Sequence, residues 1–166
     1  MTALTPYLLF DGHCCEAMEF YKSCFGGELT VTKVKDSPVK DRMPAVQHEK
    51  VIHARLTSGN VEIAASDWLR PDRTPIRGNT VCLFLSGGTL RELKALFDKL
   101  SDGAELADPL KEQFFGTYGA LNDKFGCSLD VSNRPKALAN GMTAERGHRS
   151  NRHEIHFADV RHESRG

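Results

Sequence analysis

The chain has 166 residues and carries 22 Lys and Arg side chains against 22 Asp and Glu, so it fits one ordinary domain without net charge. A neutral chain lacks the general positive field that attracts the phosphates of nucleic acids. No apolar run approaches the ~20 residues that a membrane-spanning helix needs. Five cysteines, an odd number that includes the neighbours Cys14 and Cys15, do not suggest a set of disulfides. We therefore expect a soluble cytoplasmic protein without nucleic-acid or membrane partners.

The charge is unevenly distributed along the chain. Residues 133–166 contain seven Lys and Arg and four acidic residues, a net charge of +3, so residues 1–132 carry −3. All five cysteines, the single Trp and eight of the nine Phe lie in residues 1–132. We predict that residues 1–132 form the folded domain and that residues 133–166 form a basic, His-rich and poorly ordered tail.

The first half of the folded domain predicts a strand, a helix and three further strands. Residues 7–10 are a short apolar run. The apolar residues of 17–25 have the spacing of one helix face, and Gly26-Gly27 is a typical helix end. Residues 29–34 predict the second strand, and residues 50–67 contain the other two.

Residues 50–67 predict a hairpin with a defined register. Apolar and polar residues alternate from Ile52 to Leu56, and Gly59-Asn60 is a two-residue turn that suits the twist of paired strands. This turn places Leu56 opposite Ile63, so the apolar side chains of both strands share one face. The opposite face then presents the side chains of His53, Arg55, Glu62, Ala64 and Ser66.

The second half of the domain repeats this order of elements. A strand is predicted at 81–85, and Thr89 and Glu92 have the spacing of a capping box at the start of a helix. Asp102-Gly103 ends that helix. Three strands follow, at about 105–110, 117–121 and 128–132. The repetition indicates an internal duplication of two modules.

Several separated segments carry a resemblance to a known family. In chain order they are Thr5–Gly12, Glu16–Tyr21, Phe25–Gly27, Ile52–Ala54, Ser66-Asp67, Tyr118-Gly119 and Asp123–Gly126. In these segments the chain resembles PhnB-like proteins, a branch of the vicinal oxygen chelate superfamily that includes glyoxalase I, bleomycin-resistance proteins and extradiol dioxygenases. The resemblance covers about residues 3–132.

The resemblance implies an α+β, glyoxalase-like fold of two βαβββ modules, residues 3–68 and 79–132, with helices on the outer face of curled mixed sheets. It also implies a homodimer with a small-molecule cavity inside each cup. Combined with the hairpin register, the resemblance implies that the apolar side chains of the hairpin point toward the helices. These are Ile52, Ala54, Leu56 and Ile63. The other set, with His53, Arg55 and Glu62, should line the cavity.

The resemblance also allows a test for a metal site. Metal-dependent relatives carry four ligands, typically His, Glu, His and Glu, on the first and last strands of the two modules, and leave a coordination position open for substrate. Here residues 5–10 contain no His or carboxylate, Ala64 and Thr80 stand near two other ligand positions, and only Asp130 is a ligand type. The sequence therefore favours a binding protein that sequesters a small molecule. The alternative is a lyase, isomerase or dioxygenase in which His53 and Asp130 hold Zn, Ni, Mn or Fe in a rearranged site.

His53 and Glu62 are the candidate catalytic residues. Histidine titrates near neutral pH, and a carboxylate can orient its imidazole for general acid–base chemistry. In the alternative interpretation Glu62 and Arg55 form a solvated ion pair, and His53 makes an ordinary hydrogen bond at the rim.

A further set of residues is predicted to contact the ligand. Arg55 and Ser66 lie on the predicted cavity face, and three aromatic residues, Trp68, Phe114 and Phe115, could form the floor of a cavity for a planar molecule. The alternative for the aromatic residues is a place in the core or in a dimer contact. The substrate is not identified by the sequence.

Overall fold

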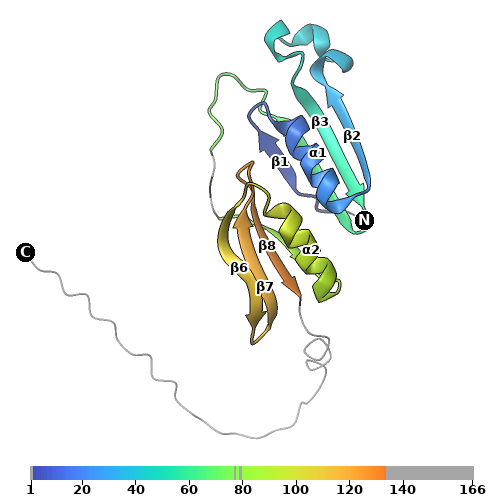
Figure 1. Ribbon diagram of the computed structural model, residues 1–166. Coiled ribbons are helices and arrows are strands. Elements are labelled where there is room, and N and C mark those ends of the chain that lie inside the picture. Colours follow the sequence, from blue (N-terminus) through green and yellow to red (C-terminus); the bar gives the residue numbers. More distant parts are fainter. Residues whose placement is uncertain (1, 77, 79, 134–166) are drawn as a thin grey trace, which may run out of the picture.

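The computed structural model describes residues 2–76, 78 and 80–133, and these form two modules, each with a four-stranded mixed sheet and one α-helix (Figure 1). The predicted fold of two βαβββ modules is therefore confirmed. Almost all of the predicted tail, residues 134–166, lies outside the described residues, so its separation from the domain stays a prediction.

The first module contains the first sheet, with strand order β1-β4-β3-β2. Its elements are β1 (Tyr7–Phe10), α1 (Cys14–Phe25), β2 (Glu28–Lys33), β3 (Val51–Ser58) and β4 (Val61–Asp67). The connection between β2 and β3 carries three short 3₁₀ helices, Val34–Asp36, Lys40–Arg42 and Ala45–Gln47. Strand β1 runs parallel to β4, and the other neighbours are antiparallel.

The second module contains the second sheet, with strand order β5-β8-β7-β6. Its elements are β5 (Leu83–Ser86), α2 (Leu90–Leu100), β6 (Glu105–Gln113), β7 (Gly116–Asn122) and β8 (Ser128–Asn133). The predicted capping box of α2 is present, because the Thr89 hydroxyl accepts from the Glu92 backbone N–H and the Glu92 carboxylate accepts from the Thr89 N–H. Strand β6 extends past its predicted end, with two irregularities in its pairing with β7.

The predicted hairpin register is confirmed, with one correction at its outer end. Leu56 pairs with Ile63, and Arg55 pairs with Ala64. However, Val51, which is 1% exposed, packs in the helix-covered core in place of the predicted Ile52. The reason is a bulge: Thr32 of β2 pairs with His53 and Lys33 pairs with Val51, so the alternation of faces shifts at Ile52.

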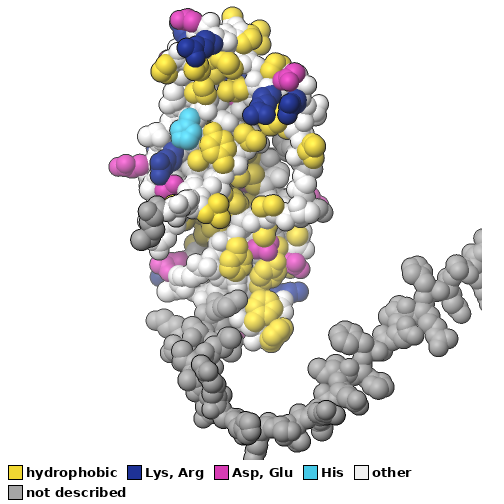
Figure 2. Space-filling view, turned by 180° about the vertical axis from the view of Figure 1, so that it is seen from behind, with side chains coloured by type: hydrophobic (Ala, Val, Ile, Leu, Met, Phe, Trp, Pro, Cys, Tyr) yellow, Lys and Arg dark blue, Asp and Glu magenta, His cyan; other side chains and the backbone are white. Residues whose placement is uncertain are grey.

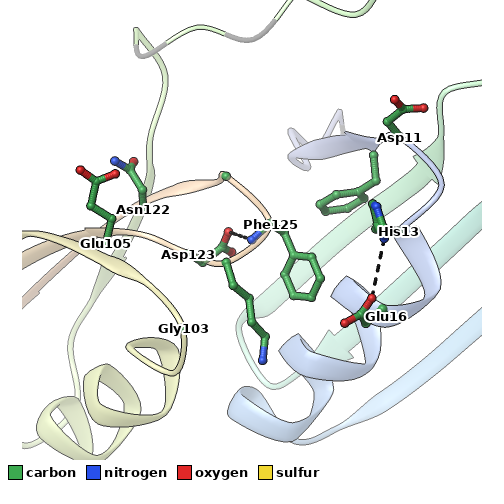
Figure 3. A pocket seen from close by; sticks show the side chains of 11 residues that line it. Asp11, His13, Glu16, Gly103, Glu105, Asn122, Asp123 and Phe125 are labelled. Carbon is green, nitrogen blue, oxygen red and sulfur yellow. Dashed lines mark hydrogen bonds and ion pairs between the residues drawn. The ribbon is translucent and has the colours of Figure 1, made fainter.

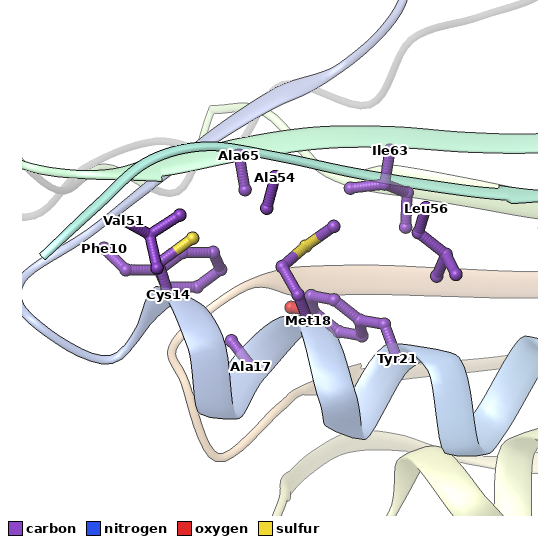
Figure 4. Close-up of a cluster of buried hydrophobic side chains, with 10 residues drawn as sticks. All are labelled: Phe10, Cys14, Ala17, Met18, Tyr21, Val51, Ala54, Leu56, Ile63 and Ala65. Carbon is purple, nitrogen blue, oxygen red and sulfur yellow. The ribbon is translucent and has the colours of Figure 1, made fainter. Parts of the chain in front are cut away.

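Two hydrophobic clusters join the helices to the sheets. In the first cluster one face of α1 packs on β3 and β4 (Figure 4). Its members are Phe10, Cys14, Ala17, Met18, Tyr21, Val51, Ala54, Leu56, Ile63 and Ala65. The second cluster consists of Cys24, Leu93, Phe97, Leu100, Leu121, Leu129 and Val131. Phe20, Phe25 and Cys127 contact both clusters, so the two modules share a continuous core.

The two helices contact each other and cover the same side of the two sheets (Figure 1). The helix-free faces of both sheets therefore lie together on the opposite side, where hydrophobic side chains gather along the length of the molecule (Figure 2). Tyr7 is 49% exposed, Leu9 52% and Phe84 56% on these faces. None of the described helices has the length and apolar character needed to cross a membrane.

Candidate functional site

The helix-free face of the first sheet has a floor of small side chains between two larger rows. Ala64 and Ser66 of β4 form the floor, because alternate residues of a strand point to the same face and Ala65 between them lies in the core. Tyr7 of β1 pairs with Ala64, and Leu9 pairs with Ser66. On the other side of the floor, the His53 ring lies 6.0 Å from the Tyr7 ring between centroids. The predicted cavity-facing residues therefore share one face.

Glu62 is bonded to Arg55 and Thr5. The Arg55 guanidinium lies 2.9 Å from the Glu62 carboxylate, and the Thr5 hydroxyl donates to the same oxygen at 2.9 Å. The hydrogen bond from Arg55, followed by that from Thr5, holds the pKa of Glu62 below its usual value. Glu62 pairs with Thr57, which lies four residues along β3 from His53, or about 13 Å at the rise of a strand. The structure thus contains the predicted ion pair and does not place Glu62 where it could orient His53.

The Arg55–Glu62 pair predicts an acid-sensitive contribution to stability. Because the pKa of Glu62 is lower in the folded chain than its ordinary 4.5, the pair stabilises the fold above that value and its contribution is lost as the pH falls through the folded pKa. We expect Glu62→Gln to lower the melting temperature slightly at about pH 7 and by less at about pH 3. Glu19→Gln, at an exposed position on α1, serves as the control. An equal effect of Glu62→Gln at both pH values would contradict the assignment.

Ser66 and Trp68 line one pocket at the end of β4. This pocket has a volume of about 340 Å³ and is lined by Leu9, Ser66, Asp67, Trp68, Leu69 and Arg70. The indole N–H of Trp68 donates to the carbonyl oxygens of Arg70 at 2.8 Å and Arg73 at 2.7 Å, and its backbone N–H donates to Phe10. Two predicted ligand contacts therefore lie side by side on a part of the chain that hydrogen bonds hold in place.

The other predicted aromatic residues lie far from Trp68. Phe114 and Phe115 are at the turn between β6 and β7, 95% and 36% exposed, and their ring centroids are 4.9 Å apart. This turn and the end of β1, to which Trp68 is bonded, are at opposite ends of the two-module body (Figure 1). A single chain therefore does not form the predicted floor of three aromatic residues.

The helix-free face of the second sheet centres on Asp130 of β8. Asp130 pairs with Phe84 of β5 and with Ala120 of β7. Both the Cys82 thiol and the Tyr118 hydroxyl hydrogen-bond to Asp130. Loss of solvation, followed by the interaction with Asp130, raises the pKa of both groups. The Cys82 thiol and the Tyr118 phenol are thereby favoured as neutral hydrogen-bond donors.

Sequence reasoning missed both partners of Asp130. It placed Thr80 near the ligand position of the fifth strand, but β5 begins at Leu83, and Cys82 is the residue beside Asp130. The two-residue repeat of a strand was the available signal, because it puts Cys82 and Phe84 on one face and Leu83 and Leu85 on the other.

The residues of this chain do not fit the metal site of metal-dependent relatives. Among the described residues, no three His, Cys, Asp or Glu side chains are grouped so that they could hold a metal ion. The two predicted ligands, His53 and Asp130, lie on different sheets. Ala64 in turn forms part of the floor of the first sheet.

A further hollow, of about 680 Å³, lies between the modules on the side of α1 (Figure 3). Its Asp123 carboxylate accepts hydrogen bonds from the Tyr21 hydroxyl at 2.6 Å and from the backbone N–H groups of Phe125 and Cys127 at 2.9 and 2.8 Å. His13 faces Glu16 at 3.7 Å. The buried acidic group of this hollow is therefore used to hold the β7–β8 turn against α1.

Comparison with known proteins relates this arrangement to a family. The family model described as 3-demethylubiquinone-9 3-methyltransferase matches residues 2–132. Protein PA1353 from Pseudomonas aeruginosa is 30% identical, with a TM-score of 0.73, over 81% of this chain and 98% of that chain. A PhnB protein from Bacillus cereus, titled a putative 3-demethylubiquinone-9 3-methyltransferase, is 25% identical, with a TM-score of 0.64, over 80% and 99%.

The fold extends to more distant proteins. A glyoxylase/bleomycin resistance protein/dioxygenase domain from Frankia sp. EAN1pec shares 15% identity over 82% of this chain and 94% of that chain, with a TM-score of 0.56. At this identity the likeness concerns the fold alone, which is consistent with the vicinal oxygen chelate superfamily. The chain belongs to the PhnB-like family described as 3-demethylubiquinone-9 3-methyltransferase, which has the glyoxalase-like fold.

Proposed function

We propose that this protein binds a small molecule in a cavity that two copies of the chain enclose between their helix-free faces. The observation that carries this proposal is the exposure of Tyr7, Leu9 and Phe84 on the side of the molecule that neither helix covers. Exposed apolar surface of this extent is typical of interaction and ligand sites. The cavity requires a second sheet, because both helix-free faces of one chain point the same way.

A homodimer with a two-fold axis supplies that second sheet. Such an axis, placed between the modules, sets the first sheet of one copy against the second sheet of its partner. His53, Arg55 and Ser66 of one copy then face Asp130 across the cavity. The arrangement also brings the Trp68 end of one chain to the Phe114–Phe115 end of the other, which supports the proposed role of these aromatic residues around a planar ligand.

The contacts of the site favour binding over catalysis. Glu62, the proposed orienting carboxylate, is engaged by Arg55 and Thr5. The Asp130 carboxylate is hydrogen-bonded by Tyr118 and Cys82, whose raised pKa values favour the neutral forms. The site therefore offers hydrogen bonds and aromatic surface in place of an assembled acid–base pair.

The alternative function is a divalent-metal-dependent lyase, isomerase or dioxygenase. Two residues of metal-ligand types interact in the second module, Cys82 just before β5 and Asp130 on β8. His53 of a partner copy, opposite them in the proposed dimer, would be a third. This observation keeps Zn, Ni, Mn or Fe as candidate cofactors.

One set of measurements tests the proposal. We expect a sedimentation mass near twice 18.4 kDa at micromolar concentration and a rise in melting temperature with a planar aromatic ligand in protein free of metal. Leu9→Asp should weaken dimerisation at least about tenfold, since it buries a charge in the interface. Leu90→Asp, at a similarly exposed leucine on α2, is the matched control.

Two outcomes would count against the binding proposal. A mass near 18.4 kDa for the unmodified chain would contradict the dimer. Near-stoichiometric metal that is lost in His53→Ala or Asp130→Ala would favour the enzyme instead.

A further inference from the structure

The carboxylates at the outer end of the first sheet already have partners. Asp67 is 3% exposed and accepts hydrogen bonds from the backbone N–H groups of Cys14 at 3.0 Å and Val51 at 2.8 Å. It thereby ties the start of α1 to the start of β3. On the same sheet, Glu62 is bonded to Arg55. These acidic groups therefore offer little capacity to a cationic ligand.

Two hydrogen-bond donors at this end of the sheet, Ser66 and Arg70, have no side-chain partner among the described residues. Ser66 is 7% exposed, and within the described part of the chain its hydroxyl makes no hydrogen bond. The Arg70 guanidinium is exposed and forms no ion pair with a described residue. The neighbouring cations are in use, since Arg73 faces Asp72 and Lys50 donates to the Trp68 carbonyl. Ser66 and Arg70 can therefore both donate to a ligand that carries a hydrogen-bond acceptor, preferably a negatively charged one.

The same two residues line the pocket of about 340 Å³ at the end of β4. Leu9 provides an apolar wall, and Trp68 provides a large ring whose N–H is already hydrogen-bonded to two carbonyls. Ser66 points into the pocket, because it shares the helix-free face with Leu9, its partner in β1. The Ser66 hydroxyl is not among the buried side-chain atoms without a partner, so water reaches it in the free chain and a ligand that accepts from it replaces that water.

We propose that this pocket binds a small planar aromatic carboxylate. Its carboxylate accepts from the Ser66 hydroxyl and from the Arg70 guanidinium, and its ring lies against Trp68 and Leu9. The inference rests on the proposed function, since the pocket opens on the face that would line the dimer cavity. It goes beyond the proposed function by specifying that the ligand is an anion and that its carboxylate points toward Ser66 and Arg70.

The single tryptophan of the chain provides a direct measurement. We expect para-nitrobenzoate, whose nitro group quenches indole fluorescence, to quench Trp68 saturably. The neutral isostere para-nitrobenzamide, which quenches in the same way, should bind at least about tenfold more weakly, because it lacks the charge that Arg70 and Ser66 recognise. Binding of the anion should also weaken as salt concentration rises.

Two variants test the assigned contacts. Ser66→Ala and Arg70→Gln should each weaken para-nitrobenzoate about tenfold and weaken para-nitrobenzamide less, because the amide keeps only one, uncharged acceptor oxygen. Arg91→Gln, at an exposed position on α2, removes the same charge far from the pocket and should change neither affinity. Unaltered melting temperatures of the variants would show that the fold is retained.

The outcomes separate this inference from the proposed function. Equal affinity for the anion and the amide, or anion binding that survives both Ser66→Ala and Arg70→Gln, overturns the anion pocket while leaving a dimeric binder of planar molecules intact. The anion pocket is also overturned if para-nitrobenzoate gives no saturable quenching in a dimer that other planar compounds stabilise. A monomer that no planar compound stabilises overturns the proposed function itself.

Discussion

Asp123→Ala is expected to lower the free energy of unfolding by about 3 to 5 kcal/mol, the larger of the stability effects that we predict. The Asp123 carboxylate accepts from the Tyr21 hydroxyl, which is 102 residues away in sequence, and from two backbone N–H groups of the β7–β8 turn. Tyr21 is fully buried. Removal of the Asp123 carboxylate leaves the buried Tyr21 hydroxyl without an acceptor at the point where the first module meets the second.

Urea unfolding of a pair of variants tests this expectation. Tyr21→Phe removes one hydrogen bond and keeps the ring in the core, so it should cost only about 1 to 2 kcal/mol. Asp123→Asn keeps the size of the side chain but has one acceptor oxygen, and we expect an intermediate loss. If Asp123→Ala cost no more than Tyr21→Phe, the turn amides would contribute nothing and the proposed role of Asp123 would be wrong.

Gly27→Ala is expected to destabilise the fold by about 2 to 5 kcal/mol, because it combines an unfavourable backbone conformation with a backbone overlap. Gly27 has a φ of +83°, and an added Cβ would overlap the Thr57 carbonyl oxygen and lie 2.6 Å from the Ser58 Cβ. Both neighbours belong to β3, which pairs with β2 immediately after Gly27. Relief of the overlap would require the two strands to move apart.

The preceding residue provides the control for this prediction. Gly26 has a φ of +74°, but an added Cβ would meet no atom within 4 Å. Gly26→Ala should therefore cost only the conformational term, about 1 to 3 kcal/mol, because a φ of +74° with a ψ of −157° is a backbone conformation that essentially only glycine adopts. The two substitutions are at adjacent positions with positive φ, but only Gly27→Ala introduces an overlap. The difference between their unfolding midpoints therefore measures the cost of the overlap. Equal losses in the two variants would show that β3 adjusts freely to the added methyl group.

The local features of this protein could be predicted from the sequence. The Gly59-Asn60 turn and the alternation around it determine the pairing of Leu56 with Ile63, since a two-residue turn leaves one register that places the apolar side chains on one face. The capping box at Thr89 and Glu92 is similarly local. The repeated order of elements, together with the family resemblance, therefore led to the correct fold.

The partners of the site residues were decided by the tertiary structure. Glu62 is bonded to Thr5 in the segment before β1 as well as to Arg55, and Asp130 is bonded to Cys82 and Tyr118 from two other strands. That the Ser66 hydroxyl has no partner within the described residues could be recognised only once the neighbouring donors and acceptors had been placed.

Face and register follow from the periodicity of a single strand or hairpin, so the sequence alone determined which side chains share a surface. The bulge at Ile52, by contrast, depends on how β2 meets β3 across a long connection. The separation of Trp68 from Phe114 depends on how the two modules pack through Phe20 and Phe25. Contacts between segments distant in the chain arise from the packing of the whole core, and no local pattern specifies them.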